Sequence, residues 1–233
     1  MNKDKLNLSI IVPLVSRNEP WQELLKQLEK VKSPKVFEVI FVLPDTEEQD
    51  LSTSSITESR SFRWVRAPKG RASQMNRGAE LATGDFFWFL HVDSLLIEPW
   101  QRPYFFNQDA LYYHDLRFTE ELPMMRINEW GVWWRSHLLK MPFGDQGFLL
   151  SRELFEKVGG YPMDCRYGED HLLVWKVRQR GGVILALGQS LRTSARKYLE
   201  KGWFLLTVKH LWLTYLQAAP MLLEILKVKW RVK

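Results

Sequence analysis

The stretch "GDFFWFLHVDS", residues 84–94, decides how this chain is expected to fold. Its side chains from Phe86 to Leu90 are apolar without alternation, and the sequence turns polar at Asp93 and Ser94. An apolar run without a period of two is typical of a strand that is covered on both faces in a parallel sheet. A carboxylate after such a strand is expected where the strand leaves the core and meets a ligand cleft.

Similar short runs alternate with helical patterns along the chain. Strands are predicted at 8–15, 36–43, 61–67 and 85–91, and helices over 18–32 and 73–83. Asn18 and Pro20 mark the start of the first helix, and Gly84 ends the second. The alternation predicts an α/β fold with a mostly parallel central sheet flanked by helices and right-handed crossovers.

The second half of the chain is less regular. Helices are predicted over 151–158 and 169–180, a strand over 183–187, and an apolar helical segment over 199–229. Residues 100–146 are rich in aromatic side chains but poor in periodicity, so no element is assigned there. No apolar run reaches the ~18–20 residues of a membrane span.

Composition sets broad limits. The 233 residues are 45% hydrophobic, and no linker-like stretch divides them, so one large domain is expected. The single Cys165 excludes an intramolecular disulfide and is typical of a reducing, cytoplasmic compartment. A net charge of +6 favours a phosphate-bearing partner. The basic residues are scattered without a nucleic-acid-binding module, so no nucleic acid partner is expected.

Asp93 and the start of the helix at 73–83 are the first candidates for chemistry. Asp93 is either a ligand for a divalent cation or the cap of the next turn. Gly70 and Arg71 precede a helix whose amino terminus is a natural anion site, although a capped surface helix has the same pattern.

Two more groups of carboxylates follow. Asp145 and Gln146 lie between glycines in "MPFGDQGFLL", before an apolar run. Glu169 and Asp170 begin a predicted helix, where a carboxylate either caps the helix or acts as a general base. The histidines lack zinc-ligand spacing, and no serine lies in a nucleophile elbow, so zinc and serine-hydrolase chemistry are not favoured.

Taken in order, these motifs resemble the inverting family 2 glycosyltransferases with the GT-A fold. The closer likeness is to a bacterial subgroup with "GRAxQMNxGAxxAxGDxLxFLHADT", "GDQGxFxRRxxFExxGGFP", an "ED" pair and "TSxRR". This chain has "GRASQMNRGAELATGDFFWFLHVDS", "GDQGFLLSRELFEKVGGYP", "GED" and "RTSARKY" in the same order. The resemblance implies a GT-A domain over 1–198, with a nucleotide-sugar half at 1–95 and an acceptor half at 96–198.

The resemblance also implies roles. Asp170 is expected to be the general base with Glu169 as its neighbour, and Asp93 the ligand for Mg²⁺ or Mn²⁺. Contacts with a UDP- or GDP-linked donor are expected from Pro13, Glu19, Asp45, Gly70, Arg71, Asn76, His91 and Arg196. Contacts with the donor sugar or the acceptor are expected from Gly144, Asp145, Gln146 and Trp134. The expected acceptor is a hydroxyl of a glycan, a lipid or a small molecule.

Two departures from the family pattern fall where the base and ribose would bind. Leu43 stands where the family carries an acid, with Asp45 two positions later, and the loop after Pro13 has extra residues. An alternative is therefore a family member that binds a nucleotide or a partner without turnover.

Two aromatic regions leave alternatives open. Trp130, Trp133, Trp134 and Phe143 either pack in the core or form an acceptor groove. The segment 199–233 either packs on the domain or a second subunit, or lies at the anionic inner face of the cell membrane.

Overall fold

The structure is a computed structural model of the chain, and it describes residues 7–29, 37–47, 56–57, 60–97, 107–165, 168–195 and 199. Its strands are β1 (Leu8–Pro13), β2 (Phe37–Pro44), β3 (Ile56–Thr57), β4 (Arg60–Ala67), β5 (Phe86–Phe89), β6 (Leu95–Leu96), β7 (Ala110–Phe118), β8 (Phe148–Ser151) and β9 (Val183–Thr193). Its helices are α1 (Trp21–Glu29), α2 (Arg71–Leu81), α3 (Pro123–His137), the short 3₁₀ helix η1 (Gly144–Gln146), α4 (Arg152–Lys157) and α5 (Glu169–Gln179).

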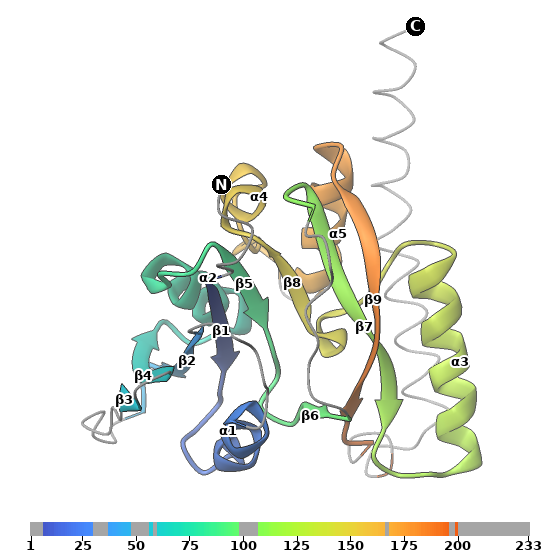
Figure 1. Cartoon of the computed structure of the whole chain (residues 1–233), viewed down its shortest axis with the longest axis horizontal. Helices are drawn as coiled ribbons and strands as arrows, with labels where there is room; N and C mark the ends of the chain where they lie inside the picture. Colours follow the sequence, from blue (N-terminus) through green and yellow to red (C-terminus); the bar gives the residue numbers. More distant parts are fainter. Residues whose placement is uncertain are drawn as a thin grey trace, which may run out of the picture.

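The described strands form one sheet in the order β3-β4-β2-β1-β5-β8-β7-β9-β6 (Figure 1). Strands β4, β2, β1 and β5 are parallel, so their carboxyl ends share one edge. Strand β8 runs antiparallel to both β5 and β7, and β9 is parallel to β7. The carboxyl ends of β7 and β9 therefore lie at the same edge as those of the central strands. This mixed α/β sheet, parallel at its centre, confirms the predicted fold class.

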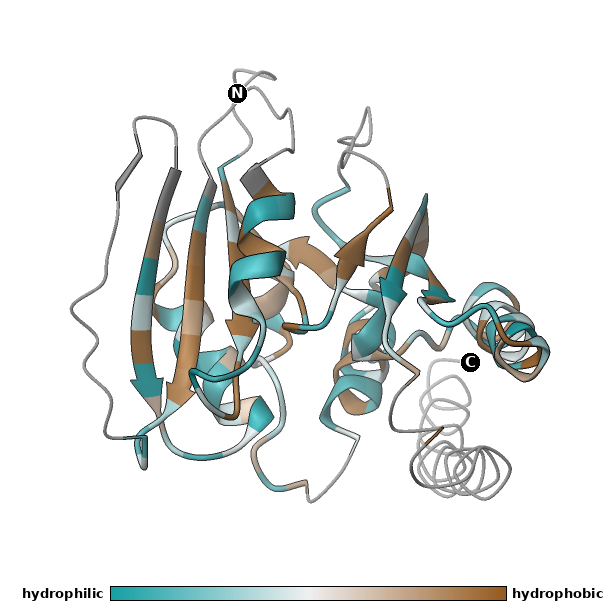
Figure 2. Ribbon diagram, turned by 90° about the horizontal axis from the view of Figure 1, so that it is seen from below, coloured by the Kyte–Doolittle hydropathy of each residue, from teal (hydrophilic) through white to brown (hydrophobic). Residues whose placement is uncertain are grey.

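Two apolar layers cover the faces of the sheet. Alternate residues of β1 enter different clusters: Ile11 packs with Met75 and Ala79 of α2, and Ile10 packs with Leu24 of α1. Gly78 allows α2 its close approach, because an added Cβ would lie 2.5 Å from Cγ2 of Ile11. Figure 2 shows hydrophobic residues along the strands and hydrophilic residues on the outer side of α1.

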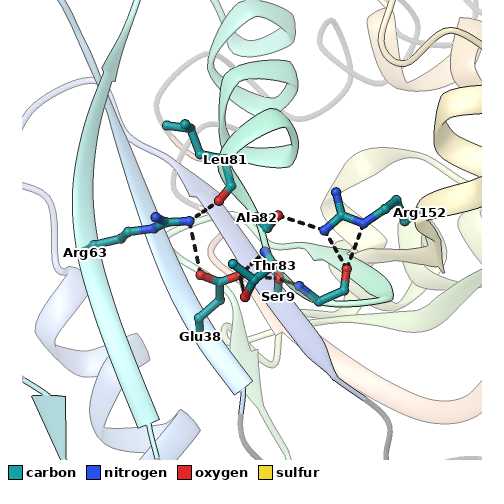
Figure 3. Close-up of polar contacts among 8 residues, drawn as sticks. Ser9, Glu38, Arg63, Leu81, Ala82, Thr83 and Arg152 are labelled. Carbon is teal, nitrogen blue, oxygen red and sulfur yellow. Dashed lines mark hydrogen bonds and ion pairs between the residues drawn. The ribbon is translucent and has the colours of Figure 1, made fainter.

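A buried carboxylate joins the amino-end edge of the sheet. Glu38 on β2 accepts hydrogen bonds from Oγ of Ser9 at 2.6 Å and from Oγ1 of Thr83 at 2.8 Å, and pairs with Arg63 at 3.2 Å (Figure 3). Burial raises the pKa of Glu38, but these hydrogen bonds and the Arg63 charge outweigh it, so the pKa is lowered. Arg152 donates to the carbonyl oxygens of Ala82 and Gly84 in the same region. The network fixes the edge opposite the predicted ligand cleft.

The unassigned region 100–146 contains β7 and α3. Strand β7 is buried along almost its whole length, so it has no alternation to detect. Helix α3 exposes Ile127, Trp130 and Trp134 instead of covering them, so its sequence lacks an ordinary amphipathic pattern. Figure 1 shows α3 beside β7 and β9, on the opposite flank of the molecule from β3 and β4.

Apart from Leu199, the predicted C-terminal segment 199–233 lies outside the described residues, and with it the predicted membrane contact. Within the described ranges, no helix has the length and apolar character needed to cross a membrane.

Candidate active site

Asp170 lies in the first turn of α5 and packs directly against the backbone of Gly144. A Cβ added at Gly144 would lie 2.2 Å from Oδ2 and 2.4 Å from Cγ of Asp170. Gly144 also donates a backbone hydrogen bond to the carboxylate. A residue with any side chain at position 144 would therefore displace the Asp170 carboxylate.

The environment of Asp170 raises the pKa of its carboxyl group. Burial raises its pKa to about 7, and the charges of Glu169 and Asp145 act in the same direction, while Arg71 opposes them. Its Oδ1 atom is buried and has no hydrogen-bond partner among the described residues. A carboxylate poised near neutrality with an unused acceptor atom has the properties of a general base.

Arg71 begins α2 and faces both carboxylates of α5. Its Nη1 atom lies 3.5 Å from Oε1 of Glu169 and 3.9 Å from Oδ2 of Asp170. Both distances exceed that of a charge-assisted hydrogen bond, and the Arg71 side chain is 42% exposed. The guanidinium is therefore available to an anionic ligand. Gly70 directly precedes it, in a left-handed conformation (φ 141°).

Tyr161 lies near Asp170, Glu169 and Arg71, and their charges act on its pKa. Burial, followed by the charges of Asp170 and Glu169, raises the pKa of Tyr161 well above its usual value. Its hydroxyl is buried without a partner in the described part of the chain. The backbone of Tyr161 is held by Asn76, whose amide donates to the carbonyl at 2.8 Å and accepts from the N–H at 2.9 Å. The Asn76 side chain, predicted to contact the donor, thus ties the segment after α4 to α2.

The side chain of Gln146 lies in the interior of the fold. Its side chain is fully buried, and its Oε1 atom accepts from Oγ of Ser136 at 2.8 Å and from the Phe143 N–H at 3.1 Å. Its Nε2 atom donates to the carbonyl of His114 at 2.9 Å. Gln146 therefore joins η1 to α3 and β7, and its contact with a sugar stays a prediction. Asp145, its half-buried neighbour, affects Asp170 through its charge.

The carboxyl ends of β1 and β2 are held by Gln74, which donates to the carbonyls of Leu14 at 2.6 Å and Val42 at 2.7 Å. The loop after Pro13 is shaped by Glu19, whose carboxylate accepts from the Val15 N–H at 2.6 Å. Glu19 therefore shapes the loop in addition to its predicted role at the donor.

The second strand ends differently from the family pattern. Leu43 is fully buried in the core, so nothing polar replaces the missing acid at this position. Asp45 is exposed just beyond it, and its N–H donates to the carbonyl of Ala67 at 2.8 Å.

Asp93 lies in a turn in which the Ser94 N–H donates to the carbonyl of His91 at 3.1 Å. The pairing of Phe89 with Phe148 brings the residues after β5 to the same edge as η1. Within the described part of the chain, no three His, Cys, Asp or Glu side chains gather to hold a metal ion. Asp93 fits Mg²⁺ or Mn²⁺ only as a single carboxylate ligand, with the remaining ligands supplied by phosphate oxygens and water.

The predicted site residues thus divide into two groups. The first group gathers around the Asp170 carboxylate: Arg71, Gly144, Asp145, Glu169 and Asp170 itself. The second group lies at the same edge of the sheet: Pro13, Glu19, Asp45, Gly70, His91 and Asp93. Trp134 is 45% exposed on α3, and Arg196 lies outside the described residues.

Sequence reasoning missed Tyr161 and Gln74. The only sequence signal for either residue was its place inside a quoted motif, "GRASQMN" for Gln74 and "GDQGFLLSRELFEKVGGYP" for Tyr161.

Neither a known family model nor a curated protein matches this sequence. Among solved structures, the mannosyltransferase PcManGT from Pyrobaculum calidifontis, in complex with GDP-Man and Mn²⁺, is similar with a TM-score of 0.62 and 16% identity, over 93% of this chain and 65% of that one. A fragment of S. aureus TarS (residues 1–349) is similar with a TM-score of 0.56 and 15% identity, over 81% and 60%. The chain thus spans less than two thirds of each. At this identity the likeness shows the fold, which is GT-A.

Proposed function

We propose that this protein is a metal-dependent, inverting glycosyltransferase that moves a hexosyl group from a UDP- or GDP-linked donor to an acceptor hydroxyl. The observation that carries the proposal is the Asp170 carboxylate, buried against Gly144 with a pKa raised to about 7 and an unused oxygen. It lies at the carboxyl edge of a GT-A sheet, where ligands bind in open α/β folds.

The proposed reaction is a single in-line displacement. A carboxylate oxygen of Asp170 takes the proton of the acceptor hydroxyl as that oxygen attacks the anomeric carbon, and the nucleoside diphosphate leaves. Arg71 turns from the two carboxylates toward the diphosphate. Because Arg71 lowers the pKa of Asp170, its withdrawal makes Asp170 a stronger base when the donor is bound.

Asp93 is the proposed protein ligand for a divalent cation. When bound, Mg²⁺ or Mn²⁺ would neutralise the charge that develops on the leaving diphosphate. The complex of PcManGT with GDP-Man and Mn²⁺ supports this part of the proposal by analogy of fold.

A second candidate is a protein that binds a nucleotide without turnover. The observation that favours it is the burial of Leu43, which leaves the end of β2 without the acid expected to hold the nucleotide. This candidate predicts donor binding that is insensitive to the state of Asp170 and no consumption of the donor.

The test combines binding and turnover. UDP- and GDP-linked hexoses are screened by thermal shift with and without Mn²⁺, and hydrolysis of the stabilising donor is then followed by release of the nucleoside diphosphate. We expect Asp170→Asn to retain the thermal shift and lose hydrolysis by about a hundredfold or more. The matched control is Asp109→Asn, a surface carboxylate that pairs with Lys157. Equal hydrolysis by wild type and Asp170→Asn would refute the assignment of the base.

A further inference from the structure

A pocket of about 550 Å³ lies between α3 and the carboxyl ends of β7 and β9. Two tryptophans of α3 line it, Trp130 and Trp133, with exposed fractions of 65% and 44%. Three arginines also line it: Arg117 on β7, Arg126 on α3 and Arg192 on β9. The pocket therefore combines accessible indole rings with clustered guanidinium groups.

Two of these arginines are neighbours on adjacent strands of the sheet. Arg117 and Arg192 are direct partners in the register of the parallel β7–β9 pair, so their side chains lie on the same face. Like charges in directly opposite positions destabilise a sheet. Glu129 relieves only one of them, because its carboxylate binds Arg117 at 2.9 Å and the Phe118 N–H at 2.8 Å.

Arg192 is left without a counter-charge. Its Nε atom is buried and makes no hydrogen bond in the described part of the chain, and its guanidinium makes no ion pair there. Two acids of the pocket lining already have partners: Asp115 binds His137 at 2.7 Å, and Glu120 accepts from the Ala195 N–H at 2.8 Å. An anion in the pocket would supply the missing charge.

The chemistry of the lining identifies the class of ligand. Indole rings stack on the apolar faces of sugar rings, and a guanidinium binds a carboxylate or phosphate through paired N–H donors. The volume falls within the ~300–1,000 Å³ of small-molecule sites, enough for a disaccharide. The lining carries four acids and three arginines. Asp115, Glu120 and Glu129 are held by His137, the Ala195 N–H and Arg117, which leaves Arg126 and Arg192 beside the one acid with no partner among the described residues, Glu121.

We propose that this pocket binds the acceptor and that the acceptor is a saccharide carrying an acidic group. Its sugar rings stack on Trp130 and Trp133, and its carboxylate or phosphate pairs with Arg192 and Arg126. The inference rests on the glycosyltransferase function proposed above and names the class of its second substrate.

The pocket is joined to Asp170 through α3. Trp133 stacks on His137 with ring centroids 4.7 Å apart, and the preceding Ser136 binds Gln146 of η1. The first residue of η1, Gly144, is the residue against which Asp170 packs. A saccharide seated in the pocket therefore lies along the same edge of the sheet as Asp170.

The test measures binding of defined saccharides to the full chain by calorimetry. Digalacturonate and maltose phosphate supply a carboxylate and a phosphate arm, and the methyl ester of digalacturonate and maltose are their neutral partners. We expect at least one acidic disaccharide to bind about tenfold or more tightly than its neutral partner, as for a charge-assisted hydrogen bond. In Arg192→Gln this preference is expected to fall below about threefold, with unchanged or higher thermal stability because the like-charge pair is gone.

Arg180→Gln, at the exposed end of α5, is the matched control and is expected to keep the preference. Equal binding of acidic and neutral disaccharides, or a preference that survives Arg192→Gln, overturns the inference. So does inorganic phosphate binding as tightly as the disaccharides, because the tryptophans would then contribute nothing. Absence of saccharide binding together with a clear response to nucleotide-sugars overturns this inference alone. Saccharide binding without any response to nucleotide-sugars overturns the acceptor role together with the proposed function.

Discussion

Replacing Gly144 by alanine isolates the contact on which the candidate site is built. The backbone at this position is not left-handed, so alanine is not excluded by its conformation. The conflict is with Asp170 alone, because Oδ2, Cγ and Oδ1 are the three nearest atoms, at 2.2, 2.4 and 2.6 Å from the added Cβ. The carboxylate would have to move by about 1 Å to reach an ordinary contact distance.

The size of the effect follows from this geometry. Overpacking of this kind costs about 1–3 kcal/mol of unfolding free energy. In an Asp170→Ala background all three conflicting atoms are absent, so Gly144→Ala is expected to cost less than about 0.5 kcal/mol. The coupling energy between the two positions is therefore about 1–3 kcal/mol. A base displaced by 1 Å is also expected to lose about a hundredfold in rate.

The assay is urea unfolding of the wild type, both single variants and the double variant, with the m-value checked for constancy. Gly131→Ala on α3 serves as the control, because an added Cβ there meets nothing within 4 Å. It is expected to stabilise the protein by up to about 1 kcal/mol. An equal cost of Gly144→Ala in both backgrounds would refute the packing of Asp170 on Gly144.

Three further predictions test other parts of the structure. The kcat/KM of donor consumption, which reports the free protein, is expected to rise with pH through about 7 and then level off, since burial raises the pKa of Asp170 and only its deprotonated form accepts a proton; a flat profile from pH 5 to 9 would contradict this. Tyr161→Phe is expected to leave the urea midpoint unchanged or higher, because the buried hydroxyl has no partner in the described part of the chain; a loss above about 1 kcal/mol would reveal a hydrogen bond. Glu38→Gln is expected to lower the free energy of unfolding by about 1–3 kcal/mol at pH 7. Because folding lowers the pKa of Glu38, this loss of stability should be present above the pKa of the unfolded state and vanish as the pH falls through the pKa of the folded state. A loss that persists at the lowest pH would contradict the network.

The central sheet was predictable because local sequence determines it. Strands β1, β2 and β5 are short apolar runs bounded by polar residues, and burial on both faces is what such runs require. Helix α4 was also predictable from its local sequence, since Ser151 caps it by accepting a hydrogen bond from the Leu154 N–H. Strand β7 and helix α3 were not, because the burial of one and the exposed aromatic side chains of the other depend on tertiary neighbours.

The candidate site was predictable in composition but not in geometry. The start of α5 indicated that Asp170 mattered, yet capping and catalysis give the same local pattern. Its burial and its raised pKa depend on residues distant in sequence, among them Gly144, 26 positions earlier, against which it packs, and the charges of Asp145 and Arg71. Gln146 differs from Asp170 in this respect. Its place between two glycines suggested a ligand contact, whereas in the folded chain its side chain forms hydrogen bonds with Ser136 and His114.

Helix α2 is held in place by hydrogen bonds, whereas the loop after β1 is exposed, and protein engineering can use this difference. Gln74 fixes this helix to the ends of β1 and β2, Asn76 fixes it to Tyr161, and Arg71 at its start faces the base. By contrast, the loop that starts at Val15, which is 73% exposed, is shaped by the carboxylate of Glu19. For the proposed glycosyltransferase, changes of donor preference can therefore be sought by randomising this loop, while α2 keeps Arg71 in place beside Asp170.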